Sequence, residues 1–277
     1  MGKVKGKLRM KIHSMTLNWN GNGLLKTLLP TLLTNLEKTS LDADIYVRDN
    51  GSIDGSIETL KQFPVNILSI DHNRDSFAVG MNYIFEQISE AAADDDVLLF
   101  LNNDIIFKDN NSLLNMIKIM ERVDAAVVGT KLLYENGTIS HNGVIFSSKY
   151  NNMPWHFRKD CVPTKDDELT RKFQAVTAAC CLVKVKHFKK AGMFDTNLFW
   201  AFEDVALNLD ISINQKQPIV CCGKTNIIHN TSVSLQKNPV HKMFMQRNVS
   251  YFKNNWEGKY KIDHDCYLRD PNYNLIK

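Results

Sequence analysis

The sequence predicts an α/β protein built on a doubly wound, mostly parallel sheet with helices on its faces. In the first half of the 277-residue chain, segments with strand periodicity alternate with segments of helix periodicity. Residues 97–101 (VLLFL) form a continuous apolar run, which is typical of a strand buried on both faces of a parallel sheet. Polar clusters follow four of the predicted strands, where sheets of this class bind their ligands.

The elements of the first half follow in a regular order. Strands are predicted at 10–18, 43–49, 65–70 and 97–101, and helices at 23–38, in a short segment ending at Leu60, and at 78–91. Pro30 should kink or end the first of these helices. Ser52 or Asp54 is expected to cap the helix that ends at Leu60.

The second half is less regular. Strands are predicted at 125–133, 175–186 and 218–222, and helices at 186–192, 203–214 and around 238–256. The segment 147–175 is barely constrained by any pattern, and we expect it to determine specificity as a flap over the site.

Composition excludes some classes of protein. Hydrophobic residues make up 44% of the chain, which excludes wholesale disorder, and a net charge of +4 is too small to indicate a nucleic-acid binder. The vicinal cysteines at 180–181 and 221–222 lie in apolar runs and are interpreted as reduced, buried side chains of a cytoplasmic protein. No apolar run is long enough for a membrane span. The basic segment 1–11 is either a solvated tail or a weak contact with the inner face of an anionic membrane.

Asn102, Asn103 and Asp104 end the most hydrophobic predicted strand. A carboxylate at this position is a good ligand for a hard divalent cation, whose remaining ligands can be water and phosphate oxygens. An Asx-rich turn is the alternative interpretation. His229 also follows an apolar strand, and its imidazole could complete a metal site with Asp104.

The segment 49–56 (DNGSIDGS) is more specific. Asp49 at a strand end can accept hydrogen bonds from a base or a ribose, and Gly51 permits a tight turn. The phosphate-binding pattern G-x-x-x-x-G-K-[ST] and the dinucleotide pattern G-x-G-x-x-G are both absent, which disfavours ATP hydrolysis and NAD chemistry.

Glu203 and Asp204 follow an aromatic run at 199–202. Acidic residues in the first turn of a helix also stabilise the helix dipole, so a structural role is an equal alternative. In a pocket walled by Trp200 and Phe202, burial would raise the pKa of a carboxyl group towards the range of a general base. Arg247 lies on the last predicted long helix, where it could neutralise a diphosphate or belong to a solvated face.

Taken in order, these segments resemble the family-2 glycosyltransferases, especially their rhamnosyltransferase-like branch. The match runs over about residues 10–255 and rests on T-L-N-W-N (16–20), D-N-G-S-I-D-G-S (49–56), F-A-V-G-M-N (77–82), F-L-N-N-D (100–104), S-H-N-G-V-I-F (140–146), V-T-A-A-C-C-L-V (176–183), G-M-F-D (192–195), F-W-A-F-E-D-V-A-L (199–207), I-I-H-N (227–230) and Q-R-N (246–248). The resemblance implies a GT-A fold with a Rossmann-like, mostly parallel central sheet. It implies a basic tail at 1–9, a GT-A catalytic domain at 10–235 and a C-terminal helical extension at 236–277.

The resemblance also implies residue roles. Asp204 would be the base that accepts the acceptor hydroxyl's proton, Glu203 would assist it, and Asp104 with His229 would hold Mg²⁺ or Mn²⁺ against the diphosphate. The donor, a UDP-, dTDP- or GDP-sugar, would be bound by Asn18, Asn20, Asp49, Gly51, Asn73, Asn82, Asn103 and Arg247. A glycan or glycolipid acceptor would contact Trp155, His156 and Trp200. The implied reaction is one in-line displacement with inversion.

The chain departs from the family pattern at three places. Asn103 leaves one carboxylate in a triplet that often carries two, the glycine usual before Phe77 is absent, and Ala206 replaces a frequent acid. Metal affinity and donor identity therefore stay open.

Three alternatives stay open. They are a sugar-phosphate nucleotidylyltransferase, a binding module without catalysis, and a transferase that glycosylates a modified nucleic acid or a protein. The first would need a Gly- and Arg-rich loop after the first strand, where this chain has Asn18-Trp19-Asn20-Gly21-Asn22-Gly23 and no arginine.

Overall fold

The computed structural model describes residues 10–71, 75–199, 201–230 and 239–276, and for residues 239–243 it describes the backbone alone. The predicted tail at 1–9 therefore lies outside the described residues, as do Asn73 and Trp200.

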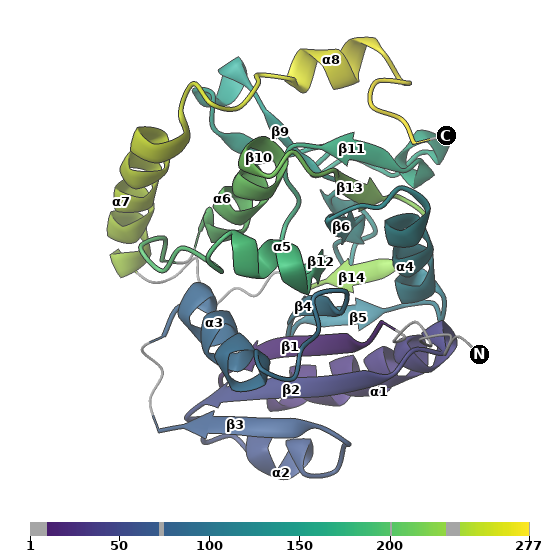
Figure 1. The fold of residues 1–277 in the computed structure, drawn as a ribbon, viewed down its shortest axis with the longest axis vertical. Helices are drawn as coiled ribbons and strands as arrows, with labels where there is room; N and C mark the ends of the chain where they lie inside the picture. Colours follow the sequence, from purple (N-terminus) through teal and green to yellow (C-terminus); the bar gives the residue numbers. More distant parts are fainter. Residues whose placement is uncertain (1–9, 72–74, 200, 231–238, 277) are drawn as a thin grey trace, which may run out of the picture.

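A large mixed sheet forms the centre of the molecule (Figure 1). Among the described residues it has eight strands in the order β11-β13-β6-β12-β4-β1-β2-β3. The four strands of the regular half are mutually parallel, and they are β1 (Ile12–Asn18), β2 (Ala43–Asn50), β3 (Asn66–Ile70) and β4 (Val97–Asn102). All five residues of the run 97–101 are fully buried, as its composition predicts.

The other half of this sheet contains the antiparallel pairs. Its strands are β6 (Val127–Thr130), β11 (Arg171–Phe173), β12 (Cys180–Lys184) and β13 (Ile219–Cys222). Strand β12 runs antiparallel to both β4 and β6, and β13 runs parallel to β6. The vicinal cysteines of β12 and β13 are buried in these strands, as predicted.

Helices cover both faces of the sheet, which confirms the predicted doubly wound α/β fold. Helices α1 (Asn22–Thr39) and α4 (Ser112–Arg122) pack on one face, and α3 (Phe77–Ile88) and α5 (Val185–Lys190) pack on the other. Alternate residues of β4 supply the two cores, since Leu99 packs with α1 whereas Phe100 packs with α3 and α5.

The structure corrects two local predictions, since Pro30 does not end α1 and neither Ser52 nor Asp54 caps α2. Helix α1 continues through Pro30, which lies on its exposed side, where water can bind the carbonyl that loses its amide partner. Helix α2 (Ser56–Leu60) has Gly55 at its N-cap and no side-chain cap. The Asp54 carboxylate accepts the Ser56 amide in the turn just before it, 3.1 Å away.

Short strands complete the sheets. A four-stranded sheet in the order β5-β14-β7-β8 contains β5 (Ile105–Phe107), β7 (Leu132–Leu133), β8 (Ile139–His141) and β14 (Ile227–His229), and a hairpin contains β9 (Val144–Phe146) and β10 (Pro154–His156). Of these, β7 lies at the end of the predicted strand 125–133 and β14 is the apolar strand expected before His229, whereas β5, β8, β9 and β10 were not predicted. Pairing of β14 with β5 sets His229 opposite Ile105, beside the end of the Asn-Asn-Asp triplet.

The remaining helical elements gather at one end of the molecule, around the β9–β10 hairpin (Figure 1). They are the 3-10 turns Ser148–Tyr150 and Lys165–Glu168, α6 (Glu203–Leu209) with the π-helical turn Asp210–Asn214, α7 (Pro239–Trp256) and α8 (His264–Arg269). Helix α7 buries Phe252 against β9 and α6. Within the described part of the chain, no helix has both the length and the apolar character needed to cross a membrane.

Candidate active site

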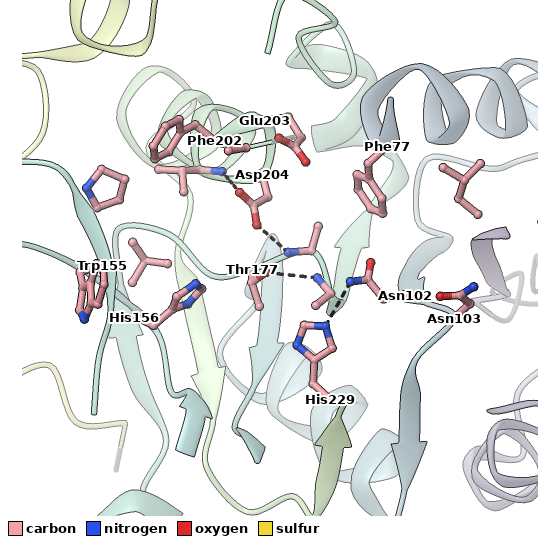
Figure 2. Close-up of a pocket in the computed structure, with 17 residues that line it drawn as sticks. Phe77, Asn102, Asn103, Trp155, His156, Thr177, Phe202, Glu203, Asp204 and His229 are labelled. Carbon is pink, nitrogen blue, oxygen red and sulfur yellow. Dashed lines mark hydrogen bonds between the residues drawn. The ribbon is translucent and has the colours of Figure 1, made fainter. Parts of the chain in front are cut away.

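A cavity of about 440 Å³ opens beyond the carboxyl ends of β1 and β4. Its position agrees with the rule that ligands bind at this edge of α/β sheets. The polar residues that line it are Asn102, Asn103, His156, Thr177, Glu203, Asp204 and His229. Figure 2 shows the acidic pair on one side of the cavity, His229 on the opposite side, and Trp155 with His156 at one end.

Three predicted donor residues are joined by hydrogen bonds at the strand ends. The Asn18 amide donates to the Asp49 carboxylate over 2.8 Å, and its oxygen accepts from Asn103 over 2.9 Å. Asn18 and Asp49 are each 1% exposed, whereas Asn103 reaches the cavity. The parallel register of β1 and β2, which sets Asn18 opposite Asp49, brings the first two together.

The turn after β2 fixes the Asp49 carboxylate. Gly51 has a φ of 72°, a conformation that glycine adopts without strain, and the chain turns back so that both Ser52 donors reach Asp49. Asn20 ties this turn to the one after β1, because its side chain accepts the Ile53 amide. A carboxylate has about four acceptor positions, so the three bonds made to Asp49 leave room for one from a ligand.

Asp104 and His229 lie beside each other, but His229 lines the cavity whereas Asp104 is not among its lining residues. Asp104 is 5% exposed, and its Oδ1 has no hydrogen-bond partner although it lies 3.4 Å from His229 Nε2. An orphaned buried carboxylate oxygen is costly, and a cation bound there would satisfy it. The pair fits a divalent cation that takes its other ligands from water and phosphate. Among the described residues no larger cluster of His, Cys, Asp or Glu offers a metal site.

Helix α6 aims the acidic pair at the cavity. Phe202 precedes it with a φ of 72°, a left-handed turn that is rare for an aromatic residue. The Asp204 carboxylate accepts the Ala178 amide over 3.0 Å and the Val205 amide over 2.7 Å, so the rest of its lone pairs are held in a fixed direction. Glu203 is 8% exposed, and its Oε2 has no hydrogen-bond partner.

Burial shifts the acid–base behaviour of both carboxyls. It raises the pKa of Glu203 to about 8, with the Asp204 charge as the second cause. Burial also raises the pKa of Asp204, against the opposing effect of the amides that bind it. The pair therefore binds a proton more tightly than two separate surface carboxyls would. A raised affinity for a proton is what a general base needs.

The aromatic end of the cavity is formed by β10. Trp155 is 38% exposed, stacks on Tyr150 at 4.4 Å and has the Lys159 ammonium 5.0 Å from its ring centre. His156 binds the buried His141 instead of stacking on a neighbour's ring face. Trp155 and His156 thus present an aromatic ring and a polar imidazole edge to the same end of the cavity.

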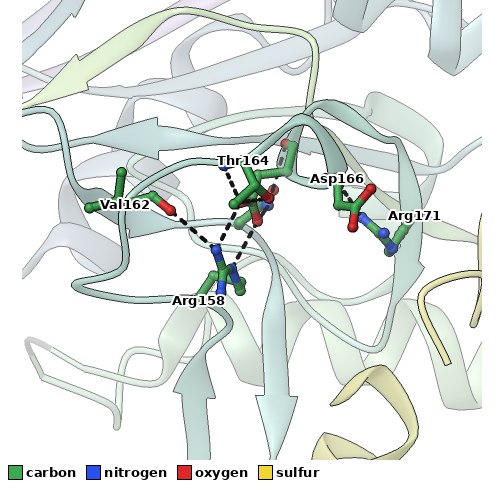
Figure 3. A network of polar contacts seen from close by, with 7 residues as sticks. Arg158, Val162, Thr164, Asp166 and Arg171 are labelled. Carbon is green, nitrogen blue, oxygen red and sulfur yellow. Dashed lines mark hydrogen bonds and ion pairs between the residues drawn. The ribbon is translucent and has the colours of Figure 1, made fainter. Parts of the chain in front are cut away.

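The segment that carries this end is tied to itself by hydrogen bonds (Figure 3). Arg158 donates twice to the Asp167 carboxylate, at 3.1 Å each, and once to the Val162 carbonyl. Asp167 also accepts from Thr164, in a capping box. Arg171 holds the far end of the loop by binding the Asp166 carbonyl. Internal bonds, rather than a long apolar pattern, give this segment its shape.

Some predicted residues are not brought into the cavity. Both amide atoms of Asn82 bind the Phe194 backbone, and Arg247 is exposed on α7 without lining the cavity. Reasoning from the sequence also missed contributors. Thr177 and Asn102 line the cavity, and the fully buried Asn248 binds the backbone of residues 199 and 201 just before the acidic pair. Thr177, Asn102 and Asn248 all lie within motifs of the family resemblance, but their positions at or beside the cavity depend on tertiary structure.

Comparison with known proteins places the chain in a family. The family model for "Glycosyl transferase family 2" matches residues 19–192. The chain is 29% identical over 218 residues to the O-antigen biosynthesis protein RfbC of Myxococcus xanthus. That match covers 76% of this chain but 16% of RfbC, so the chain spans a small part of that relative's length.

Solved structures share the GT-A fold. A mannosyltransferase from Pyrobaculum calidifontis, in complex with GDP-Man and Mn²⁺, superposes with a TM-score of 0.62 at 12% identity, over 95% of this chain and 70% of that one. TarS residues 1–349 of S. aureus, in complex with UDP-GlcNAc, superposes with a TM-score of 0.58 at 13% identity, over 92% and 78%. The predicted mostly parallel, Rossmann-like GT-A fold is confirmed.

Proposed function

The chain belongs to glycosyl transferase family 2, and we propose that it moves a sugar from a nucleotide-diphosphate sugar to an acceptor hydroxyl with inversion, using Asp204 as the general base. The observation that carries this proposal is the position of Asp204. Its carboxylate lines the cavity, is fixed by two backbone amides and lies across from the edge that carries Asn103 and His229.

The arrangement supports a single displacement. A base on one side of the anomeric carbon can accept the hydroxyl proton while the nucleoside diphosphate leaves from the other side. Glu203 sits beside Asp204, not across the cavity from it, so the site has no second carboxylate placed as a nucleophile among its lining residues. We assign Glu203, whose raised pKa favours the protonated form, the role of a neutral neighbour that assists Asp204.

The donor is proposed to bind over Asn18, Asp49 and Asn103. The turn at Gly51, which Asn20 holds in place, is proposed to shape the pocket for the donor's nucleobase. A mannosyltransferase of this fold holds GDP-Man and TarS holds UDP-GlcNAc, so the shared fold accommodates different bases. UDP-, dTDP- and GDP-sugars are therefore all candidate donors for this chain.

Mg²⁺ or Mn²⁺ is proposed to bind at Asp104 and His229. When bound there, the cation would supply charge stabilisation for the leaving diphosphate. Asp104 contributes a buried, otherwise unpartnered oxygen, and His229 contributes an imidazole nitrogen that also lies 3.3 Å from the Asn102 amide. Solved structures of this fold contain Mn²⁺, which supports the assignment.

The acceptor is proposed to be a glycan or glycolipid that contacts Trp155 and His156. Trp155 lines the cavity and is 38% exposed, so the free part of its indole can contact the apolar face of a pyranose ring. The similarity to an O-antigen biosynthesis protein favours a saccharide over a protein or a modified nucleic acid.

The proposal is tested by incubating the protein with Mn²⁺ and a panel of UDP-, dTDP- and GDP-sugars. Slow donor hydrolysis without acceptor identifies the donor, and NMR of the transferred sugar gives its anomeric configuration. We expect one donor to be hydrolysed and the product to have the inverted configuration. If no donor is turned over and none binds, the proposed function is overturned. A product with the retained anomeric configuration would overturn the proposed mechanism.

A further inference from the structure

Two histidines of the acceptor end form a directed hydrogen bond. His141, at the end of β8, is 1% exposed, and its Nδ1 lies 2.6 Å from Nδ1 of His156 in β10. Its other ring nitrogen, Nε2, accepts the Gly143 amide over 3.1 Å and the Thr177 amide over 3.4 Å. The S-H-N-G motif that contains His141 has no role in the function proposed so far.

These contacts determine where the protons lie. His141 Nε2 faces two N–H groups, so it carries a lone pair and the single proton of the ring is on Nδ1. That proton is donated to His156 Nδ1, which must then be an acceptor. The proton of His156 is therefore on Nε2, on the side of the ring turned away from His141. Two backbone amides thus fix the tautomers of two side chains in succession.

The result is a hydrogen-bond donor at the cavity. His156 lines the cavity next to Trp155, and its Nε2 has no hydrogen-bond partner among the described residues. Building on the proposed function, we propose that His156 Nε2–H donates to a hydroxyl oxygen of the acceptor sugar and that His141 is the positioning residue that keeps it a donor. The acceptor would then need a hydroxyl at one defined position beside the ring that covers Trp155.

Burial supports a neutral pair. It lowers the pKa of His156 to about 4, with the Lys159 charge as the second cause, and it lowers the pKa of His141 well below the usual range. A neutral His156 recognises an oxygen by its direction and not by charge, which is the selectivity expected for a hydroxyl.

The tautomers are read by long-range ¹H–¹⁵N NMR of the full chain. We expect the spectrum to show a neutral His156 with its proton on Nε2 and a neutral His141 with its proton on Nδ1. In His141→Met, the side chain fills the buried position but has no N–H, so the donor to His156 is lost. His156 should then show a mixture of tautomers. A wild-type His156 that is charged or has its proton on Nδ1 would overturn the proposal.

Transfer kinetics test the proposed hydrogen bond from His156 to the acceptor. The acceptors are methyl glycosides of common hexoses and deoxyhexoses, together with their monodeoxy analogues. For the wild type, one deoxy position should raise the acceptor KM about five- to tenfold, as expected for one hydrogen bond. His156→Phe should lose this discrimination, and His156→Gln, which restores an N–H donor, should recover part of it. Equal discrimination in all three proteins, or no transfer to any glycoside, would overturn the proposal.

Donor hydrolysis without acceptor separates the two proposals. If the wild type hydrolyses donor while its deoxy pattern is absent, the sugar-transfer function stands and the His156 contact fails. If neither hydrolyses any donor, the proposed function itself fails, and the NMR result still decides the tautomers.

Discussion

The proposed donor side and the proposed acceptor side of the cavity are built in different ways. On the donor side, Asn18, Asp49 and Asn103 follow long parallel strands and bind one another. On the acceptor side, short strands and left-handed turns present groups with unused capacity, such as Glu203 Oε2. The donor side is therefore organised before a ligand arrives, whereas the acceptor side keeps polar atoms free to act on one.

The largest expected effect is on the acceptor side, at the proposed base. Asp204→Asn should lower kcat by about 10²–10⁴-fold because an amide cannot accept the hydroxyl proton. Donor affinity should change little, since Asp204 does not touch the proposed donor residues. Steady-state kinetics and donor titration check this, with Asp210→Asn, on the same helical segment but outside the cavity lining, as the matched control. Near-normal transfer by Asp204→Asn would show that another group is the base.

The second-largest effect is expected at the proposed metal site, which lies between the proposed donor and acceptor sides. Asp104→Ala should weaken donor binding about 10- to 100-fold with Mn²⁺ present, because it removes a carboxylate ligand of the cation. The difference from the wild type should disappear in EDTA. Isothermal titration with the donor found by hydrolysis measures this, and Asp95→Ala, at an exposed loop, is the control. A loss that is equal with and without metal would contradict the metal assignment.

A comparison of two buried asparagines, Asn18 and Asn248, distinguishes a structural role from a role in donor binding. Asn18→Ala and Asn248→Ala should each destabilise the fold by about 1–3 kcal/mol, because each leaves buried polar groups without partners. Only Asn18→Ala should also weaken donor binding, since Asn248 supports the loop before the acidic pair. Urea unfolding and donor titration together test this contrast. Equal donor affinities in the two variants would show that the Asn18 network is only structural.

The two sides also differ in how far the sequence could predict them. Strands β1 to β4 have five or more residues with clear apolar patterns and polar ends, so their order and the position of Asn18, Asp49 and Asp104 followed from local rules. Strands such as β9 and β10 have three residues, too few for an alternating pattern to be recognised. The contact of His156 with His141 depends on that hairpin.

Some local rules were also overridden by tertiary structure. Pro30 is tolerated because its side of α1 faces water, and Asn82 serves the backbone of Phe194 because α3 packs there. Neither outcome can be read from the residue type. The acidic pair was found because it stands at the start of a helix after an aromatic run. Its environment, with Ala178 as a hydrogen-bond donor from 26 residues earlier in the chain, required the fold.

The smallest expected effect concerns the proton shared by the acidic pair. The pKa of Glu203 is about 8 in the folded chain, above its ordinary value of 4.5, so the folded state binds this proton more tightly than the unfolded chain does. The ionised form is therefore unfavourable in the fold, and stability should decrease as pH rises from about 5 to about 8. Glu203→Gln removes that penalty. Its melting temperature should match the wild type near pH 5 and exceed it increasingly towards pH 8.

The same variant should shift the pH dependence of transfer. In the wild type, Glu203 loses its proton near pH 8 and places a second negative charge beside Asp204, whereas the glutamine stays neutral. Any change of the wild-type kcat around pH 8 that comes from this ionisation should therefore be absent from the variant, while the rate near pH 6 falls only modestly. Glu257→Gln, at an exposed glutamate directly after α7 and outside the cavity lining, is the control for both measurements. A kcat profile of Glu203→Gln that matches the wild type through pH 8, together with an unchanged melting difference across pH, would mean that Glu203 does not hold the proton of the pair.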